Sequence, residues 1–390
     1  MGNVANLELF TARVNAFFLS LGWGLLVVIL LVLATYLVYL LYKHRDREKY
    51  ALDFVTLLVR LPKGIEIKID AAEQMFAGLY AIKHDGWFDF LKPEEVISFE
   101  IVGLREEIGF YISCPRKIRD LVEKQVNGAY PTAEIKIVDE VNIFNEKGRV
   151  AYTTLTLEKG KYLPLKTFKD LPTDGLSLIT SALSKMGEGE GAMIQLLVQP
   201  VGKSWQDAGR DSVQKQKKRE SDPQKANYSA DPKEMEAINN KLDKPGFKTS
   251  LRIVVSAQNE VSANVHLNNI VGAFAQFTSP HNSFVRDKFI IGQLFMLDFI
   301  YRYLPIWDWG TSVLNTEELA TVMHFPNKSV ETHHIKWLIA KNAPASNLIP
   351  TSGLRLGKSM YRGEVREVFM ENRDRQRHTY IIGKTGTGKS

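Results

Sequence analysis

The last eight residues of the sequence have the types and spacing of a phosphate-binding loop. They read GKTGTGKS and satisfy the pattern G-x-x-x-x-G-K-[ST]. Glycines let successive backbone amides turn inward toward phosphate oxygens without obstruction from a Cβ atom. Lys389 is the expected catalytic residue, bridging the β and γ phosphates of ATP, and the Ser390 hydroxyl would ligate Mg²⁺. The residues expected to bind ATP are Gly383, Lys384, Thr385, Gly386, Thr387, Gly388, Lys389 and Ser390.

A loop of this kind needs a strand before it and a helix after it. Tyr380, Ile381 and Ile382 form a short apolar run suited to the strand. The sequence ends at Ser390, before the helix whose N-terminal amides would hold the phosphates and before a second magnesium-binding carboxylate. We therefore expect the start of an incomplete RecA-like motor domain over residues 351–390, unable by itself to hydrolyse ATP. The alternative is a chance glycine turn.

An apolar run near the N-terminus predicts a membrane anchor. Residues 17–42 form a run of 26 residues without an ionisable carboxylate or amine. As a helix they would be about 39 Å long, enough to cross a hydrocarbon core of about 30 Å. The alternatives are a buried core helix or a secretory signal, whose apolar region is shorter, about 7 to 15 residues. We predict a single transmembrane helix in a lipid bilayer.

Charge on the two sides of this run predicts its orientation. Four cations crowd residues 43–49, whereas only Arg13 and the amino terminus precede the run. The positive-inside bias places residues 1–16 outside the cytoplasm and the bulk of the chain inside it.

Composition bounds the class of protein. The 390 residues include 50 Lys and Arg against 44 Asp and Glu, a net charge of +6, with 45% hydrophobic and 24% charged side chains. These fractions are those of folded globular chains and exclude wholesale disorder. The single cysteine, Cys114, excludes an internal disulfide and a thiolate zinc cluster, and fits a reducing compartment. The small positive excess predicts only weak attraction to polyanions.

Hydrophobic periodicity predicts an α+β fold after the membrane segment. Alternating runs and helical stripes follow the order βαββαβ between residues 53 and 139, and again between 151 and about 291. This is the order of the ferredoxin-like split unit. We therefore expect tandem ferredoxin-like modules at 43–148 and 149–292.

A polar stretch interrupts the second module. Residues 203–248 contain clustered lysines, two Asp-Pro pairs and very few aliphatic residues, which predicts a largely disordered insertion with one helical turn near Met235. Its basic tract is expected to be a solvated tether, with a DNA or anionic-lipid contact as the alternative. After the module, residues 293–350 are expected to form a helical and irregular connector.

Capping boxes are expected at two helix starts. Asp70 with Glu73 suits the first helix of the first module, and Asn315 with Glu318 suits a helix ending near Phe325.

Histidines gather in the connector, at 324, 333 and 334. Neighbouring histidines cannot both point inward from one regular element, and no carboxylate motif accompanies them. We expect them to be hydrogen-bonded or exposed side chains rather than metal ligands.

Two segments carry a family resemblance: HTYIIGKTGTGKS at residues 378–390 and LNTEELATVMHFP at residues 314–326. With the N-terminal membrane helix, they resemble the membrane-anchored DNA-pumping ATPases, the TraD/TraG-like coupling proteins of conjugative type IV secretion within the FtsK/HerA superfamily. The resemblance implies a hexameric ring with ATP and Mg²⁺ between subunits, and DNA drawn through the pore. It also implies a relaxase or secretion-channel partner and a place in the bacterial inner membrane.

Two other functions stay open. The chain could be a non-enzymatic membrane interaction protein, whose two α+β modules recruit a partner while the terminal loop is vestigial. It could also belong to a membrane-anchored AAA-type ATPase that remodels proteins.

Overall fold

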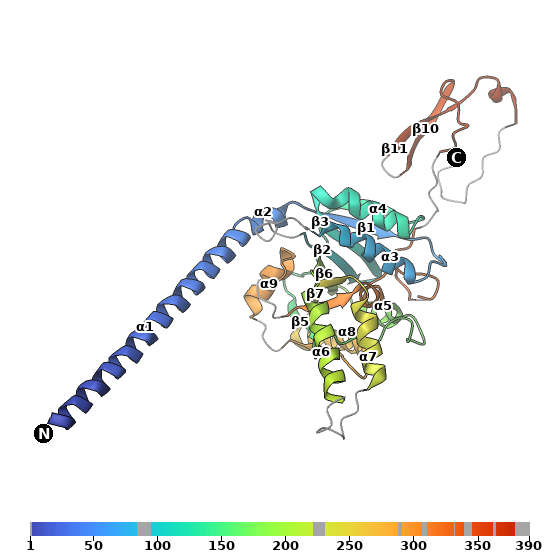
Figure 1. Cartoon of the computed structure of the whole chain (residues 1–390). Helices are drawn as coiled ribbons and strands as arrows, with labels where there is room; N and C mark the ends of the chain where they lie inside the picture. The colour runs from blue at the N-terminus through green and yellow to red at the C-terminus, as the bar shows by residue number, and fades with distance from the viewer. Residues whose placement is uncertain are drawn as a thin grey trace.

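The structure is a computed structural model in which one long helix leads into a large antiparallel sheet flanked by helices (Figure 1). It describes residues 2–83, 95–220, 231–287, 291–305, 310–330, 332–338, 345–361 and 364–378.

The predicted membrane segment lies within the first helix, α1 (Gly2–His44). Figure 1 shows α1 leaving the rest of the molecule as a straight rod, and the side chains along its apolar part are exposed. Among the described helices, this one is long and apolar enough to cross a membrane, with a mean hydropathy of 2.8 in its most apolar window. A short helix, α2 (Arg47–Leu52), follows it.

The first α+β module has the predicted order βαββαβ. Its strands lie in the order β4-β1-β3-β2, and neighbouring strands are antiparallel. Its first helix buries Met75, Phe76 and Leu79 because these side chains share one helix face. The predicted Asp70–Glu73 capping box is wrong: Asp70 is the first helical residue after the cap Ile69, and no side chain caps this helix. The elements are β1 (Phe54–Arg60), α3 (Asp70–Leu79), β2 (Ile97–Leu104), β3 (Glu107–Pro115), α4 (Arg119–Ala129) and β4 (Glu134–Val138).

The second module repeats this order, with strands arranged β6-β7-β5-β8. Its last strand spans only three residues, and the other edge of the large sheet is the five-residue β4. Short edge strands limit unwanted pairing with other chains. The elements are β5 (Arg149–Leu157), α5 (Gly175–Leu183), β6 (Gly191–Pro200), β7 (Gly246–Ala257), α8 (Glu260–Ala273) and β8 (Phe284–Arg286).

The two modules share one sheet because β2 of the first pairs with β6 of the second. Their antiparallel register runs from Ile97 opposite Val198 to Leu104 opposite Gly191. One face of the joined sheet carries the main core, in which Phe76 of the first module contacts Phe247 of the second. The opposite face carries a smaller apolar cluster that includes Phe295 and Phe299.

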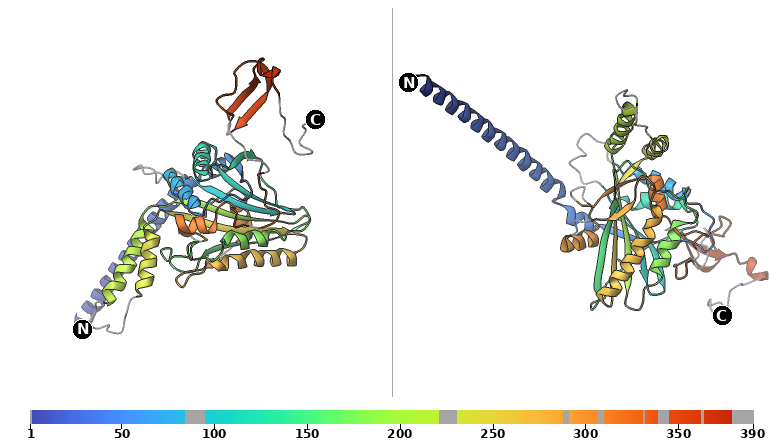
Figure 2. Two further views of the ribbon diagram at one scale, coloured as in Figure 1. Left: turned by 90° about the vertical axis from the view of Figure 1, so that its right-hand side faces the viewer. Right: turned by 90° about the horizontal axis from the view of Figure 1, so that it is seen from below.

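The polar stretch 203–248 is folded wherever the structure describes it, so the prediction of disorder is wrong there. It forms α6 (Ser204–Glu220), α7 (Pro232–Leu242) and the start of β7. Trp205 and Val213 on α6 meet Ile238 and Leu242 on α7 in a small buried cluster. These few apolar residues are enough to hold the two helices together. Within each helix they lie one or two turns apart, on the side that faces the other helix. Figure 2 shows the two helices side by side, projecting from the sheet.

The connector supplies two helices and another strand: α9 (Gly292–Ile300), β9 (Ser312–Asn315), which pairs with β7, and α10 (Thr316–Val322). The Asn315–Glu318 capping box is confirmed, because each side chain accepts the other residue's backbone N–H. The helix ends at Val322, before the predicted Phe325.

A hairpin that the sequence did not predict follows the connector. Its strands, β10 (Leu354–Tyr361) and β11 (Glu364–Met370), pair with each other in a separate sheet. The 3-10 helices within the described residues are η1 (Tyr80–Ile82), η3 (Arg116–Ile118), η5 (Phe274–Phe277) and η6 (Asp374–Gln376).

Candidate functional site

The predicted nucleotide loop lies outside the described residues. The structure describes the chain up to His378, so Tyr380–Ile382 and all of Gly383–Ser390 carry no structural account. The roles of Lys389 and Ser390 toward ATP and Mg²⁺ therefore stay predictions. The described chain offers three other clusters of polar groups, treated in turn.

A cavity of about 350 Å³ lies where α1 meets the sheet. Tyr36, Tyr39 and Lys43 of the last turns of α1 form one wall, and the segment 301–305 after α9 forms another. Its cationic lining residues are Lys43, Arg47, Lys248 and Arg302, and its lining among the described residues includes one carboxylate, Glu95, which is paired with Lys117. The cavity is therefore predominantly basic and aromatic.

Arg47 joins the juxtamembrane helix α2 to this wall. Its guanidinium centre lies 3.8 Å from the ring centroid of Tyr303, a cation–π contact, and it donates a hydrogen bond to the carbonyl of Leu304. Its nearest carboxylate oxygen, on Asp298, is 3.8 Å away. A planar guanidinium can lie flat on an aromatic ring while its edge donates hydrogen bonds.

A second arginine, Arg252, lies behind the cavity wall and is fully buried in the sheet. It donates to the backbone carbonyl of Asp298 at 2.7 Å, to the Gln195 side chain at 3.3 Å and to the carbonyl of Tyr303. Burial lowers its pKa to about 10 although Asp298 opposes the shift, and Arg47 adds to the lowering. Burial likewise raises the pKa of Asp298. One carboxylate thus faces two arginines.

A third arginine, Arg302, fixes the same segment to β2. It donates to Glu100 at 2.7 and 3.3 Å and to Glu140 at 2.5 Å. Burial opposes its charge, but these two carboxylates overcome that effect and raise its pKa. Its backbone is left-handed, with φ of 55°, a conformation uncommon outside glycine. The three arginines together hold the segment 298–305 between the juxtamembrane helix and the sheet.

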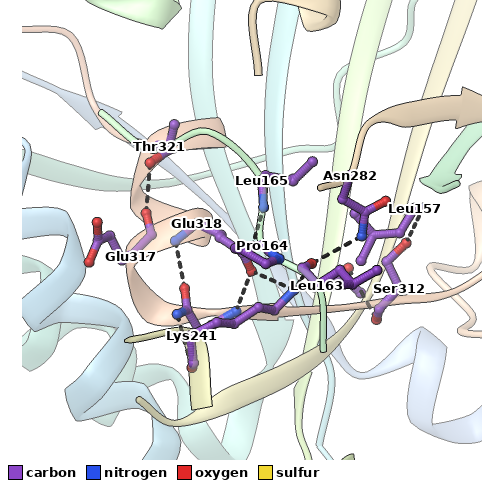
Figure 3. Close-up of polar contacts among 12 residues, drawn as sticks. Leu157, Leu163, Pro164, Leu165, Lys241, Asn282, Ser312, Glu317, Glu318 and Thr321 are labelled. Atoms are coloured by element: carbon purple, nitrogen blue, oxygen red, sulfur yellow. Dashed lines mark hydrogen bonds and ion pairs between the residues drawn. The ribbon is translucent and has the colours of Figure 1, made fainter. Parts of the chain in front are cut away.

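A second cluster centres on Lys241 of α7, whose side chain is 1% exposed (Figure 3). Its Nζ lies 3.0 Å from Oε2 of Glu318 on α10 and donates to the carbonyl of Leu163 at 3.0 Å. Glu318 also accepts backbone N–H groups of Leu165, at 2.8 Å, and of Asn315, at 3.0 Å. Burial lowers the pKa of Lys241 while Glu318 opposes this shift. Both charged groups are occupied by the protein itself, so the pair fits a structural role better than a catalytic one.

The third cluster contains His324, whose Nδ1 donates to the carbonyl of Ala320 at 2.8 Å and whose Nε2 lies 2.9 Å from Oδ1 of Asp174. His333 and His334 are exposed, so all three connector histidines are hydrogen-bonded or exposed as predicted. Ser329 also donates to Asp174, at 2.8 Å. The carboxylate lies between the serine and the histidine, which is the wrong order for a serine nucleophile activated by a histidine base.

Comparison with known families shows the family to which this chain belongs. A family model described as a domain of unknown function (DUF8128) matches residues 48–338. The chain belongs to the DUF8128 family. No curated protein matches the sequence.

The DUF8128 region contains the strands and helices of both modules, the helical pair α6–α7, the connector up to Leu338, and the clusters around Lys241 and His324. It begins within α2, so the cavity lies between this region and the end of α1. The hairpin β10–β11 and the phosphate-loop motif follow it.

Sequence reasoning missed the buried arginines of the DUF8128 region, although a signal was present. Glu100, Gln195 and Arg252 interrupt apolar strands at positions that alternate with core residues. Across the sheet, Glu100 lies opposite Gln195, and Gln195 lies opposite Arg252. A charged residue inside a continuous apolar strand therefore indicated a polar row on one sheet face.

Proposed function

We propose that this protein is a membrane-anchored, ATP-dependent DNA translocase of the conjugative coupling class. The observation that carries the proposal is the phosphate-loop motif at Gly383–Ser390 in the same chain as a helix apolar enough to cross a membrane. ATP with Mg²⁺ would bind at this motif, with Lys389 bridging the phosphates and Ser390 holding the metal. DNA would be the transported polymer.

The arrangement of the chain supports this proposal. Cations crowd residues 43–49 beyond the apolar run, which favours residues 1–16 outside and the DUF8128 region inside the cytoplasm of a bacterial inner membrane. In the order of the chain, the DUF8128 region lies between the apolar helix and the nucleotide motif, and its two modules share one continuous sheet. A hexameric ring and a relaxase or secretion-channel partner follow from the family resemblance.

The test is ATP turnover by the protein expressed from its complete reading frame, with and without DNA. Lys389→Ala should abolish turnover because the β and γ phosphates lose their bridging charge. Lys358→Ala is the matched control, since it removes an exposed lysine of β10 that lies outside the motif. Turnover indifferent to DNA would favour the protein-remodelling ATPase, and unaltered turnover in Lys389→Ala would refute the assigned nucleotide site.

A second candidate is a non-enzymatic interaction platform. The family match favours it, because the match covers the paired modules and most of the connector but not the nucleotide motif. Here the Lys389→Ala gene should restore the phenotype of a deletion strain as well as the wild-type gene does. Failure of Lys389→Ala to complement, with normal protein levels, would leave the translocase as the better proposal.

A further inference from the structure

We propose that the juxtamembrane cavity binds the phosphate of an anionic phospholipid. This inference rests on the membrane anchoring in the proposed function. The cavity wall on α1 comes from Tyr36, Tyr39 and Lys43, the last two turns of the apolar run and the first cation after it. Tyrosines and lysines at the end of a membrane span lie at the level of the lipid headgroups. The cavity therefore opens where lipid phosphates are concentrated.

The chemistry of the lining favours an anion. Lys43, Arg47 and Lys248 come from three different elements and converge on the cavity, and its carboxylate Glu95 is already paired with Lys117. Arg47 is held in place by the ring of Tyr303 and by the Leu304 carbonyl. A cation fixed in this way can meet a phosphate without losing much conformational freedom. At about 350 Å³, the volume falls in the range of ligand sites.

The charged residues behind the cavity wall also favour an anion. Arg47 and Arg252 both face Asp298, so two cations share one carboxylate on this side of the wall. Arg302, a further lining residue, is balanced by Glu100 and Glu140. A phosphate entering beside Arg47 would add a negative charge in a partly buried place, where ionic attraction is stronger than in water.

The outer face of α9 favours a lipid over a free phosphate compound as the source. Ile291, Leu294, Leu297 and Ile300 are 68%, 56%, 49% and 48% exposed. They belong to or immediately precede the helix that leads into the cavity wall at Tyr301. Figure 1 shows α9 close to the base of α1. An apolar helix face beside basic and aromatic residues is typical of a surface that rests in the membrane interface.

The experiment measures lipids retained by the complete, detergent-solubilised protein in native mass spectrometry. Wild type should retain phosphatidylglycerol in preference to phosphatidylcholine. Lys43→Gln with Arg47→Gln should lower that retention about tenfold. Arg45→Gln with Lys49→Gln is the matched control, because it removes two cations from the same flank that do not line the cavity. It should retain phosphatidylglycerol like the wild type.

Three outcomes would overturn the inference. Equal loss of lipid in both double variants would show general attraction of the flank to anionic membranes. Equal retention of phosphatidylcholine would show an apolar contact without phosphate recognition. Displacement of the bound lipid by millimolar glycerol 3-phosphate would show a site for free phosphate compounds.

Two further measurements separate this inference from its premises. Because Arg47→Gln could loosen the segment 298–305, Lys43→Glu alone serves as a second variant. Lys43 lies on α1, outside the DUF8128 region, and its change should also lower retention while thermal unfolding of that region stays the same. Extraction of the protein from membranes by alkaline carbonate would refute the membrane anchor itself. A carbonate-resistant protein without lipid preference would refute only the lipid site.

Discussion

Lys241 and Glu318 form an ion pair of 3.0 Å in which each side chain is 1% exposed. They belong to α7 and α10, and Lys241 also bonds the carbonyl of Leu163. The pair therefore links the helical pair α6–α7, the loop before α5 and the connector. Removing either partner of such a pair is destabilising, because the other charge is then buried without compensation.

Lys241→Met is expected to lower the free energy of unfolding by about 3–5 kcal/mol, because it leaves the Glu318 carboxylate buried without its cation. The double variant Lys241→Met with Glu318→Gln should be more stable than the single one. Glutamine removes the unpaired charge and is accepted at this position of a capping box. Thermal unfolding of the detergent-solubilised protein measures both.

Lys233→Met is the control for this prediction, since Lys233 is an exposed residue of the same helix. It should change stability by less than about 0.5 kcal/mol. If Lys241→Met behaved like Lys233→Met, the buried ion pair would not exist in solution.

Asp174 predicts a loss of stability in acid. Burial opposes its ionisation, but hydrogen bonds and charge from His324, with further bonds from Ser329 and the Leu176 amide, lower its pKa to about 2. Its pKa is thus below the unfolded value, near 3.8. The resulting stabilisation, on the order of 2 kcal/mol, is complete above pH 4 and is lost as the pH falls toward 2.

Asp174→Asn tests this linkage, because asparagine can still cap α5 but carries no charge. The variant should be less stable than the wild type at pH 7, and the difference should shrink between pH 4 and pH 2. Exposed Asp211→Asn should show no such trend. A difference that stayed constant with pH would contradict the lowered pKa.

The docking of α6–α7 predicts resistance to trypsin. Arg210 and Lys215 are exposed cleavage sites on α6, but a folded helix is a poor protease substrate. Trp205→Ala should speed cleavage at these sites. Trp205 is only 6% exposed and packs in the small cluster that holds α6 against α7. The control is Val261→Ala, which changes an apolar residue 74% exposed on α8. Rapid cleavage of the wild type at Arg210 would restore the prediction of disorder.

Cys114 gives a probe of global unfolding. It is the one cysteine of the sequence, it is fully buried, and burial raises the pKa of its thiol to about 12. Since the thiolate is the reactive form, iodoacetamide at pH 8 should label the folded protein very slowly and the guanidinium-unfolded protein rapidly. A Ser181→Cys variant places a second thiol at an exposed position and should gain one rapidly labelled site. Fast labelling of the folded wild type would argue against the buried position in β3.

The sequence predicted those structural features that depend only on residues close together in the chain. Length and hydropathy alone indicated the long apolar helix that contains residues 17–42. Alternating and helical periodicities gave the repeated order βαββαβ, because each pattern depends on neighbouring residues. The Asn315–Glu318 capping box could be read for the same reason, since its two partners are three residues apart.

Local patterns also misled in two places. The Asp70–Glu73 spacing suits a capping box, but the helix begins one residue earlier than that box requires, at Asp70 itself. The composition of residues 203–248 suits disorder, but four apolar side chains on two helices meet one another and the sheet residue Val313. Composition averages over a segment and so does not reveal which of its few apolar residues face one another.

The amino-acid order by itself determined the long apolar helix, the repeated order βαββαβ and the Asn315–Glu318 capping box, because those features depend on residues within a few positions of one another. Only the tertiary structure decided that β2 pairs with β6, and that Arg302, 202 residues further along the chain, donates a hydrogen bond to Glu100. Such contacts arise from the simultaneous packing of distant segments, and burial then makes each unpaired charge too costly to keep. The basic cavity beside α1 has the same origin, since its cations come from parts of the chain that meet only after folding.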